Sequence, residues 1–209
     1  MTFRSKNLPN ILTMSRIFAV LIFVAIASVA HISIISDKSW IVALRTVAVI
    51  LALLAGLTDL LDGYLARRYH WISDFGALMD PLADKIFVAG TMLMAVEYRI
   101  IPAWIAIAVL FREFMVTGLR TLAAKKQVVI SADHWGKVKT ASQMVMLGIA
   151  GAAWVIDGGT AYLQDAKWFG LRLWYIWYGY LVAIVLVTVL SGLNYFIRYR
   201  GLFLSPKNK

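Results

Sequence analysis

Apolar residues fill six long stretches of this chain, and short polar segments separate one stretch from the next. A bilayer core about 30 Å thick is crossed by roughly 20 residues of helix. Each of the six stretches is long enough for that, at about residues 12–35, 41–65, 77–97, 101–122, 138–157 and 174–197. The pattern predicts an all-α, polytopic membrane protein with six transmembrane helices.

Composition supports a membrane protein and excludes several other classes. Of the 209 residues, 61% are hydrophobic, which is more than soluble domains normally contain. The chain has no cysteine, which excludes a disulfide framework and thiolate chemistry. The net charge of +10 fits membrane orientation and anionic lipids better than nucleic acid, so we expect the lipid bilayer as a partner and no nucleic acid.

The distribution of basic residues predicts how the chain is oriented. Most Lys and Arg residues fall in both termini and in segments 66–75 and 123–137, whereas the opposite loops contribute only Lys38, Arg99, Lys167 and Arg172. The positive-inside rule therefore places both termini in the cytoplasm. No internal repeat is visible, and we predict a single domain over residues 1–209 with residues 1–11 as a juxtamembrane segment.

Four aspartates, Asp59, Asp62, Asp80 and Asp84, lie inside or at the edge of the second and third stretches. A carboxylate within a bilayer costs a few kcal/mol, so it is expected to face a partner or a wet cavity. Spacings of three and four residues place each pair on one helix face. If the two helices are antiparallel neighbours, the acidic faces meet and form an all-oxygen site suited to Mg²⁺ or Mn²⁺. A polar network that joins helices is the alternative, although Ser, Thr or Asn usually forms such networks.

These aspartates belong to a longer pattern. It reads Asp59-x-x-Asp62-Gly63-x-x-Ala66-Arg67 and, after eight residues, Gly76-x-x-x-Asp80-x-x-x-Asp84. The pattern resembles the full signature of the CDP-alcohol phosphotransferase family. The resemblance implies a CDP-linked lipid donor and CMP as the leaving group. It also implies metal ligation by all four aspartates, a second role for Asp84 as proton acceptor, and contact of the CDP-lipid with Gly63, Ala66, Arg67 and Gly76.

A second polar group lies further along the chain. Arg112, Glu113 and Arg120 interrupt the fourth stretch, and Lys137 and Lys139 open the fifth. Because Glu113 can neutralise only one of the two arginines, we expect a phosphate pocket here, with a helix N-terminus contributing to it. The two lysines point to different sides of a regular helix, so at most one contacts the anion unless the backbone is irregular. Snorkelling side chains that follow the positive-inside rule are the alternative.

Together the two polar groups suit a transfer reaction. Two divalent ions on four carboxylates can clamp a pyrophosphate and hold attacking and leaving oxygens in line. The run from Arg112 to Arg120, followed by Gly136-Lys137-x-Lys139-Thr140, resembles the bacterial members of the family that use glycerol 3-phosphate as acceptor. The resemblance implies that CDP-diacylglycerol and glycerol 3-phosphate give phosphatidylglycerophosphate and CMP. It also suggests a bacterial inner-membrane enzyme and a homodimer, and the positive-inside rule places the aspartates at the cytoplasmic face.

Other functions remain open at this stage. Inositol phosphate or phosphatidylglycerol could replace glycerol 3-phosphate as the acceptor. A divalent-cation transporter would need an acidic path to the far side, where the loops offer only the scattered Asp37, Asp157 and Asp165. A non-catalytic scaffold would leave the four carboxylates without a purpose.

The segment before the first stretch also has two interpretations. It reads Pro9-Asn10-x-x-Thr13-x-x-Arg16. In one interpretation Asn10 or Thr13 caps the first helix. In the other, the segment lies near the nucleotide pocket, as a similar segment does in bacterial members of the family.

Overall fold

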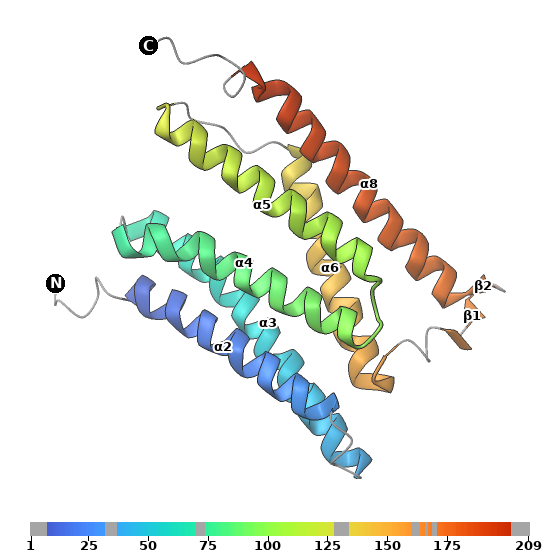
Figure 1. Ribbon diagram of the computed structural model, residues 1–209. Coiled ribbons are helices and arrows are strands. Elements are labelled where there is room, and N and C mark those ends of the chain that lie inside the picture. Colours follow the sequence, from blue (N-terminus) through green and yellow to red (C-terminus); the bar gives the residue numbers. More distant parts are fainter. Residues whose placement is uncertain are drawn as a thin grey trace. The chain divides into compact units, whose positions relative to one another are not determined.

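The computed structural model describes residues 8–31, 37–69, 74–127, 134–159, 164–165, 167–168 and 171–201. Within these ranges, the description of side chains leaves out 8–10, 12, 31, 59–69, 74–78, 125, 134–135, 137, 157 and 168. The described residues contain six helices (Figure 1): α2 Leu8–His31, α3 Lys38–Tyr69, α4 Asp74–Glu97, α5 Ala103–Lys125, α6 His134–Asp157 and α8 Leu173–Tyr199.

Each predicted stretch corresponds to one helix. Four helices are long and apolar enough to cross a membrane, in the segments Thr13–Ala30, Lys38–Thr58, Val138–Ile156 and Leu173–Tyr199. The sequences of α4 and α5 are interrupted by charged residues, which lower their hydropathy. The helical structure is thereby confirmed and four helices are candidate membrane spans, while the number of six spans and the cytoplasmic termini remain predictions.

One short element departs from the all-α prediction. Strands β1 (Lys167–Trp168) and β2 (Leu171–Arg172) pair antiparallel, with Lys167 opposite Arg172. The apolar pattern predicts no strand between the stretches 138–157 and 174–197. A ladder of two residues per strand is too short to produce the alternating pattern by which strands are recognised.

The first helix begins earlier than the capping interpretation requires. Because α2 starts at Leu8, Pro9 occupies the first turn, where its missing N–H costs no hydrogen bond. Asn10 and Thr13 therefore lie inside the helix, and the prediction that one of them caps it is wrong.

Contacts divide the chain into two compact units. Unit 1 consists of Met1–Ile100 and Gly151–Gly159, and unit 2 consists of Ile101–Ala150 and Thr160–Lys209. Helices α2, α3 and α4 belong to unit 1, α5 and α8 belong to unit 2, and α6 passes from unit 2 into unit 1. That the chain forms one domain remains a prediction.

Small residues let the helices of unit 1 approach one another closely. Helix α2 packs against both α3 and α4. Ala27, Ala48 and Ala83 are fully buried, one in each helix. A Cβ on Gly90 of α4 would come within 3.0 Å of Val20 of α2. Such packing is typical of helices in membranes, and here it holds the α2 and α4 backbones close together.

In unit 2, α5 packs against α8 along a narrow seam. The buried residues of α8 recur at intervals of three and four, which is the spacing of residues between two helices that cross at a small angle. They are Trp177, Leu181, Ile184, Thr188, Ser191, Gly192 and Tyr195. Three of these side chains carry hydroxyl groups in otherwise apolar sequence, so polar groups are built into the seam.

Candidate active site

Two of the four aspartates have described side chains, and both lie on α4 in unit 1. Asp80 and Asp84 are one helical turn apart; Asp80 is exposed and Asp84 is half-buried. The helix continues through Pro81, which lies between them. Asp59 and Asp62 lie in the last third of α3, and their side chains fall outside the described residues.

Helix α2 supports the acidic face of α4 directly. The Thr13 hydroxyl donates a hydrogen bond of 2.5 Å to Oδ1 of Asp80. Thr13 is fully buried, and Arg16, one turn further along α2, is 2% exposed. The hydrogen bond orients the carboxylate of Asp80 and leaves its Oδ2 for another partner.

The donor chemistry at this place fits a hard divalent cation. Carboxylate oxygens are the ligands that Mg²⁺ and Mn²⁺ prefer. The carboxylate of Asp80 is exposed, and its hydrogen bond with the Thr13 hydroxyl orients it before any cation binds. Among the side chains that the structure describes, no three metal-ligating residues lie together. Two of the four predicted ligands, however, are outside that set.

Five other predicted site residues also lie outside the described side chains. Gly63, Ala66 and Arg67 belong to the last turns of α3, Gly76 to the first turn of α4, and Lys137 to the first turn of α6. Their predicted contacts with the CDP-lipid or the acceptor phosphate remain predictions.

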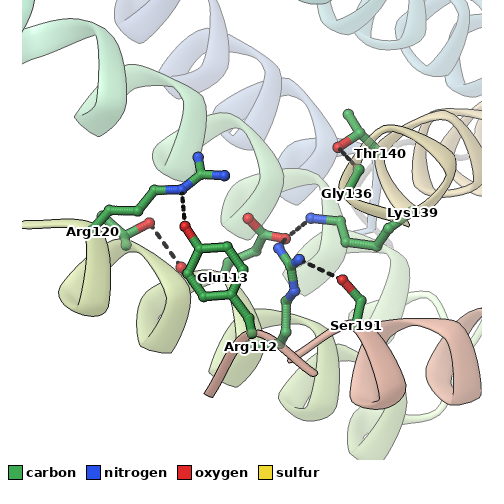
Figure 2. A network of polar contacts seen from close by, with 9 residues as sticks. Arg112, Glu113, Arg120, Gly136, Lys139, Thr140 and Ser191 are labelled. Atoms are coloured by element: carbon green, nitrogen blue, oxygen red, sulfur yellow. Dashed lines mark hydrogen bonds and ion pairs between the residues drawn. The ribbon is translucent and has the colours of Figure 1, made fainter. Parts of the chain in front are cut away.

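The second predicted group comes together in unit 2 around the carboxylate of Glu113 (Figure 2). Lys139, near the start of α6, forms an ion pair with Oε1 of Glu113, and Arg112 Nη1 lies 3.6 Å from the same oxygen. Lys139 is 4% exposed and Arg112 is 8% exposed. Among the described residues, the two cations share one carboxylate, so the three side chains together carry a net positive charge.

A hydroxyl of α8 fixes Arg112. Its Nη2 donates a hydrogen bond of 2.8 Å to Oγ of Ser191. The next residue, Gly192, leaves room for the arginine, because a Cβ there would lie 3.1 Å from Arg112 Cγ. The guanidinium is thus held by α8 on one side and by Glu113 on the other.

Arg120 is anchored separately, two turns along α5. Its Nε donates a hydrogen bond of 2.9 Å to the Tyr195 hydroxyl, and its Cζ lies 5.6 Å from the centre of that ring. The residue is exposed. Within the described part of the chain Arg120 pairs with no carboxylate, since Glu113 takes Lys139 and Arg112. The prediction that Glu113 cannot neutralise both arginines is consistent with this arrangement.

The start of α6 is helical, as predicted, and the side chain of Thr140 hydrogen-bonds within this helix. Lys139 lies in its second turn. The hydroxyl of Thr140 donates to the Gly136 carbonyl at 3.0 Å, so it is turned back onto its own helix (Figure 2). Of the two lysines, only Lys139 has a described side chain.

Sequence reasoning missed several partners. Ser191 and Tyr195 hold the two arginines, and their signal was a pair of hydroxyl residues four apart in an apolar helix. The ion pair between Lys139 and Glu113 joins two helices, so the spacing of residues along the sequence does not predict it. Thr13 was considered, but as a helix cap, whereas it holds Asp80.

The chain is similar in sequence to known proteins over most of its length. The family model described as CDP-alcohol phosphatidyltransferase matches residues 6–185. A Bacillus subtilis (strain 168) protein named CDP-diacylglycerol–glycerol-3-phosphate 3-phosphatidyltransferase is 35% identical over 194 residues, which cover 91% of this chain and 93% of that protein. Proteins with the same name from Rickettsia felis and Haemophilus influenzae are 34% and 35% identical; the matches cover 69% and 68% of this chain and 74% of each relative. The chain therefore belongs to the CDP-alcohol phosphatidyltransferase family.

Proposed function

We propose that this protein transfers the phosphatidyl group of CDP-diacylglycerol to sn-glycerol 3-phosphate, giving phosphatidylglycerophosphate and CMP. The observation that carries the choice of acceptor is the cationic group of unit 2. Among the described residues, Arg112 and Lys139 share the carboxylate of Glu113, and Arg120 pairs with no carboxylate. An acceptor that itself carries a phosphate supplies the missing negative charge. The names of the relatives point to the same reaction.

The acidic residues are assigned to the donor. The family uses a divalent metal, and we assign two ions, Mg²⁺ or Mn²⁺, to Asp59, Asp62, Asp80 and Asp84. When bound, such ions offset the charge of the pyrophosphate and of the departing CMP. Thr13 holds Asp80 ready for this task. Gly63, Ala66, Arg67 and Gly76 are assigned to the CDP moiety, where small residues allow close approach and Arg67 meets a phosphate.

The bonds that change are few. A glycerol hydroxyl oxygen forms a bond to the phosphorus that carries the diacylglycerol. The anhydride bond between that phosphorus and the CMP oxygen breaks, and CMP leaves with the electron pair. Asp84 accepts the proton of the attacking glycerol hydroxyl. Loss of this proton increases the electron density on the hydroxyl oxygen as it bonds to phosphorus.

The cations orient the acceptor for this attack. The Tyr195 hydroxyl accepts a hydrogen bond from Nε of Arg120 and so restricts the guanidinium. Little conformational freedom is therefore lost when the two Nη groups bind a phosphate. Arg112 and Lys139 are assigned to the same phosphate; because the start of α6 is helical, at most one of Lys137 and Lys139 contacts it. With the positive-inside orientation, the reaction takes place at the cytoplasmic face of a bacterial inner membrane.

A direct test offers the purified protein CDP-diacylglycerol and labelled acceptors in the presence of Mg²⁺. Labelled glycerol 3-phosphate should enter a lipid product with release of an equal amount of CMP. Labelled inositol phosphate and phosphatidylglycerol serve as competing acceptors. Incorporation of either in place of glycerol 3-phosphate would contradict the assignment of the acceptor.

Replacing Thr13 by Val should weaken metal binding without disturbing the helix. Valine has nearly the same shape but cannot donate to Asp80, and loss of a group that orients a metal ligand typically costs 10- to 100-fold in metal affinity or activity. We expect the dissociation constant for Mn²⁺ to rise about 10-fold, measured by electron paramagnetic resonance. Thr13→Ser, which keeps the hydroxyl, should restore most of the affinity. Equal affinities of Thr13→Val and the wild type would limit Thr13 to a packing role.

A further inference from the structure

A cavity of about 490 Å³ lies in unit 1 where α2, α4 and α6 end and α3 begins. Its lining includes Ala30, Arg45, Glu97, Tyr98, Arg99 and Gly158. Arg45 and Asp59 belong to the same helix and are separated by 14 residues, or about 20 Å at 1.5 Å per residue. The cavity is therefore at the opposite end of unit 1 from the aspartates, and the proposed reaction does not use it.

Arg45 lies in this cavity and forms no ion pair among the described residues. Its guanidinium lies 6.0 Å from the centre of the Trp154 ring. Its Nε is buried and makes no hydrogen bond within the described part of the chain. The ion pairs among described residues involve Arg112, Lys139 and Glu113, and none includes Arg45. Arg45 lies within the apolar segment Lys38–Thr58, where an unpaired charge is costly.

The backbone around Arg45 is shaped to admit the guanidinium. Gly158 has φ +75°, a conformation that favours glycine, and a Cβ there would lie 2.5 Å from both Nη atoms of Arg45. Trp154, which packs against the guanidinium, is in turn packed against Tyr98, with ring centres 4.7 Å apart. The arginine therefore has a preformed position.

Backbone N–H groups already pair with four of the helix carbonyl groups near the two arginines. The C-terminal ends of α4 and α6 carry partial negative charge, but backbone N–H groups already satisfy several of their last carbonyls. Gly158 N–H donates to Trp154 O at 2.8 Å, and Arg99 N–H donates to Val96 O at 2.9 Å. Tyr98 N–H and Ile100 N–H donate to Met94 O and Ala95 O. These four carbonyl groups do not need the guanidinium groups of Arg45 and Arg99 as caps.

We propose that this cavity binds the phosphodiester headgroup of a membrane phospholipid, with Arg45 and Arg99 contacting the phosphate. Arginine recognises phosphate oxygens through several N–H groups at once, and basic pockets between membrane helices bind lipid headgroups. The charged residues of the described lining, two arginines and Glu97, sum to one net positive charge, which the single negative charge of a phosphodiester neutralises. Glu97 disfavours the second charge of inorganic phosphate or glycerol 3-phosphate, so a lipid is preferred over a free phosphate.

The test counts lipid molecules bound to the purified full-length protein by native mass spectrometry. The lipid probes are dioleoylphosphatidylglycerol and dioleoylphosphatidylethanolamine. In a separate experiment, the melting temperature of the protein is measured with and without inorganic phosphate. Arg45→Gln should lower the fraction of lipid-bound protein about 10-fold and leave the rate of phosphatidyl transfer unchanged. Arg172→Gln, which makes the same change at an exposed position outside the cavity, should bind lipid like the wild type.

A second variant keeps the test decisive if Arg45→Gln does not fold. Arg99 is exposed on the turn after α4, so Arg99→Gln is expected to fold, and it should lower the lipid-bound fraction several-fold. Unchanged lipid binding in the folded variants would overturn the proposal. The proposal would also be overturned if Arg120→Ala lost the bound lipid and the cavity variants kept it, because the lipid would then bind near the acceptor-phosphate residues. Stabilisation by inorganic phosphate without any lipid adduct would overturn the lipid assignment in favour of a free phosphate.

Discussion

Asp84→Asn should lower kcat by about 1,000-fold while the protein still inserts and folds. Transfer of a proton to a positioned side chain contributes typically 10²- to 10⁴-fold, and in the proposed reaction Asp84 also binds metal. Asparagine keeps the shape of the side chain but neither accepts the proton nor supplies a negative charge. The measurement is the steady-state formation of labelled phosphatidylglycerophosphate, with the elution profile in detergent as the check on folding.

The matched control is Asp165→Asn, which makes the same change at an exposed position remote in sequence from the signature. Its activity should equal that of the wild type. Asp59→Asn and Asp80→Asn should each behave like Asp84→Asn in activity. An Asp84→Asn protein that retains a tenth or more of the wild-type kcat would remove Asp84 from the role of proton acceptor.

Arg120→Ala should raise the Michaelis constant for glycerol 3-phosphate between 10- and 100-fold and leave kcat nearly unchanged. A hydrogen bond to a charged group contributes about 1.5–3 kcal/mol, and each 1.36 kcal/mol corresponds to about a factor of ten. An increase in the Michaelis constant alone indicates lost binding that the ground state and transition state share. The measurement is the dependence of the initial rate on glycerol 3-phosphate at saturating CDP-diacylglycerol.

Two variants separate the phosphate contact from the general charge of this region. Tyr195→Phe removes only the hydroxyl that anchors Arg120, so its Michaelis constant should rise less than that of Arg120→Ala. Arg198→Ala removes an exposed arginine of the last turn of α8 and should have no effect. A Michaelis constant unchanged in Arg120→Ala would give Arg120 a structural role.

The helices could be predicted because each depends on a local pattern. Twenty or so apolar residues in a row have few alternatives to a membrane-crossing helix, and even the charged α4 and α5 lie close to the predicted stretches. The β1–β2 pair could not be predicted, because two residues per strand carry no periodicity. The start of α2 was misjudged because Asn10 or Thr13 was expected to cap the helix, whereas the helix begins at Leu8 and tolerates Pro9 in its first turn.

Within the candidate site, too, features that depend on local spacing could be predicted, and contacts between helices could not. The positions of Asp80 and Asp84 on one face of α4 follow from their spacing of four. The cluster of Arg112, Glu113 and Lys139 was predicted as a region of charge, but its pairing joins α5 to α6. Such contacts, like that of Thr13 with Asp80, depend on how closely helices pack, which local sequence does not encode.

Binding of Mn²⁺ to the purified protein, measured by electron paramagnetic resonance, tests the central claim most directly. The acidic residues of α3 and α4 are proposed to hold two divalent ions for the transfer. The account predicts two bound ions per chain, fewer in Asp59→Asn and Asp80→Asn, and a loss of turnover on chelation that added Mg²⁺ or Mn²⁺ restores. Absence of bound Mn²⁺, or undiminished turnover after complete chelation, would contradict it.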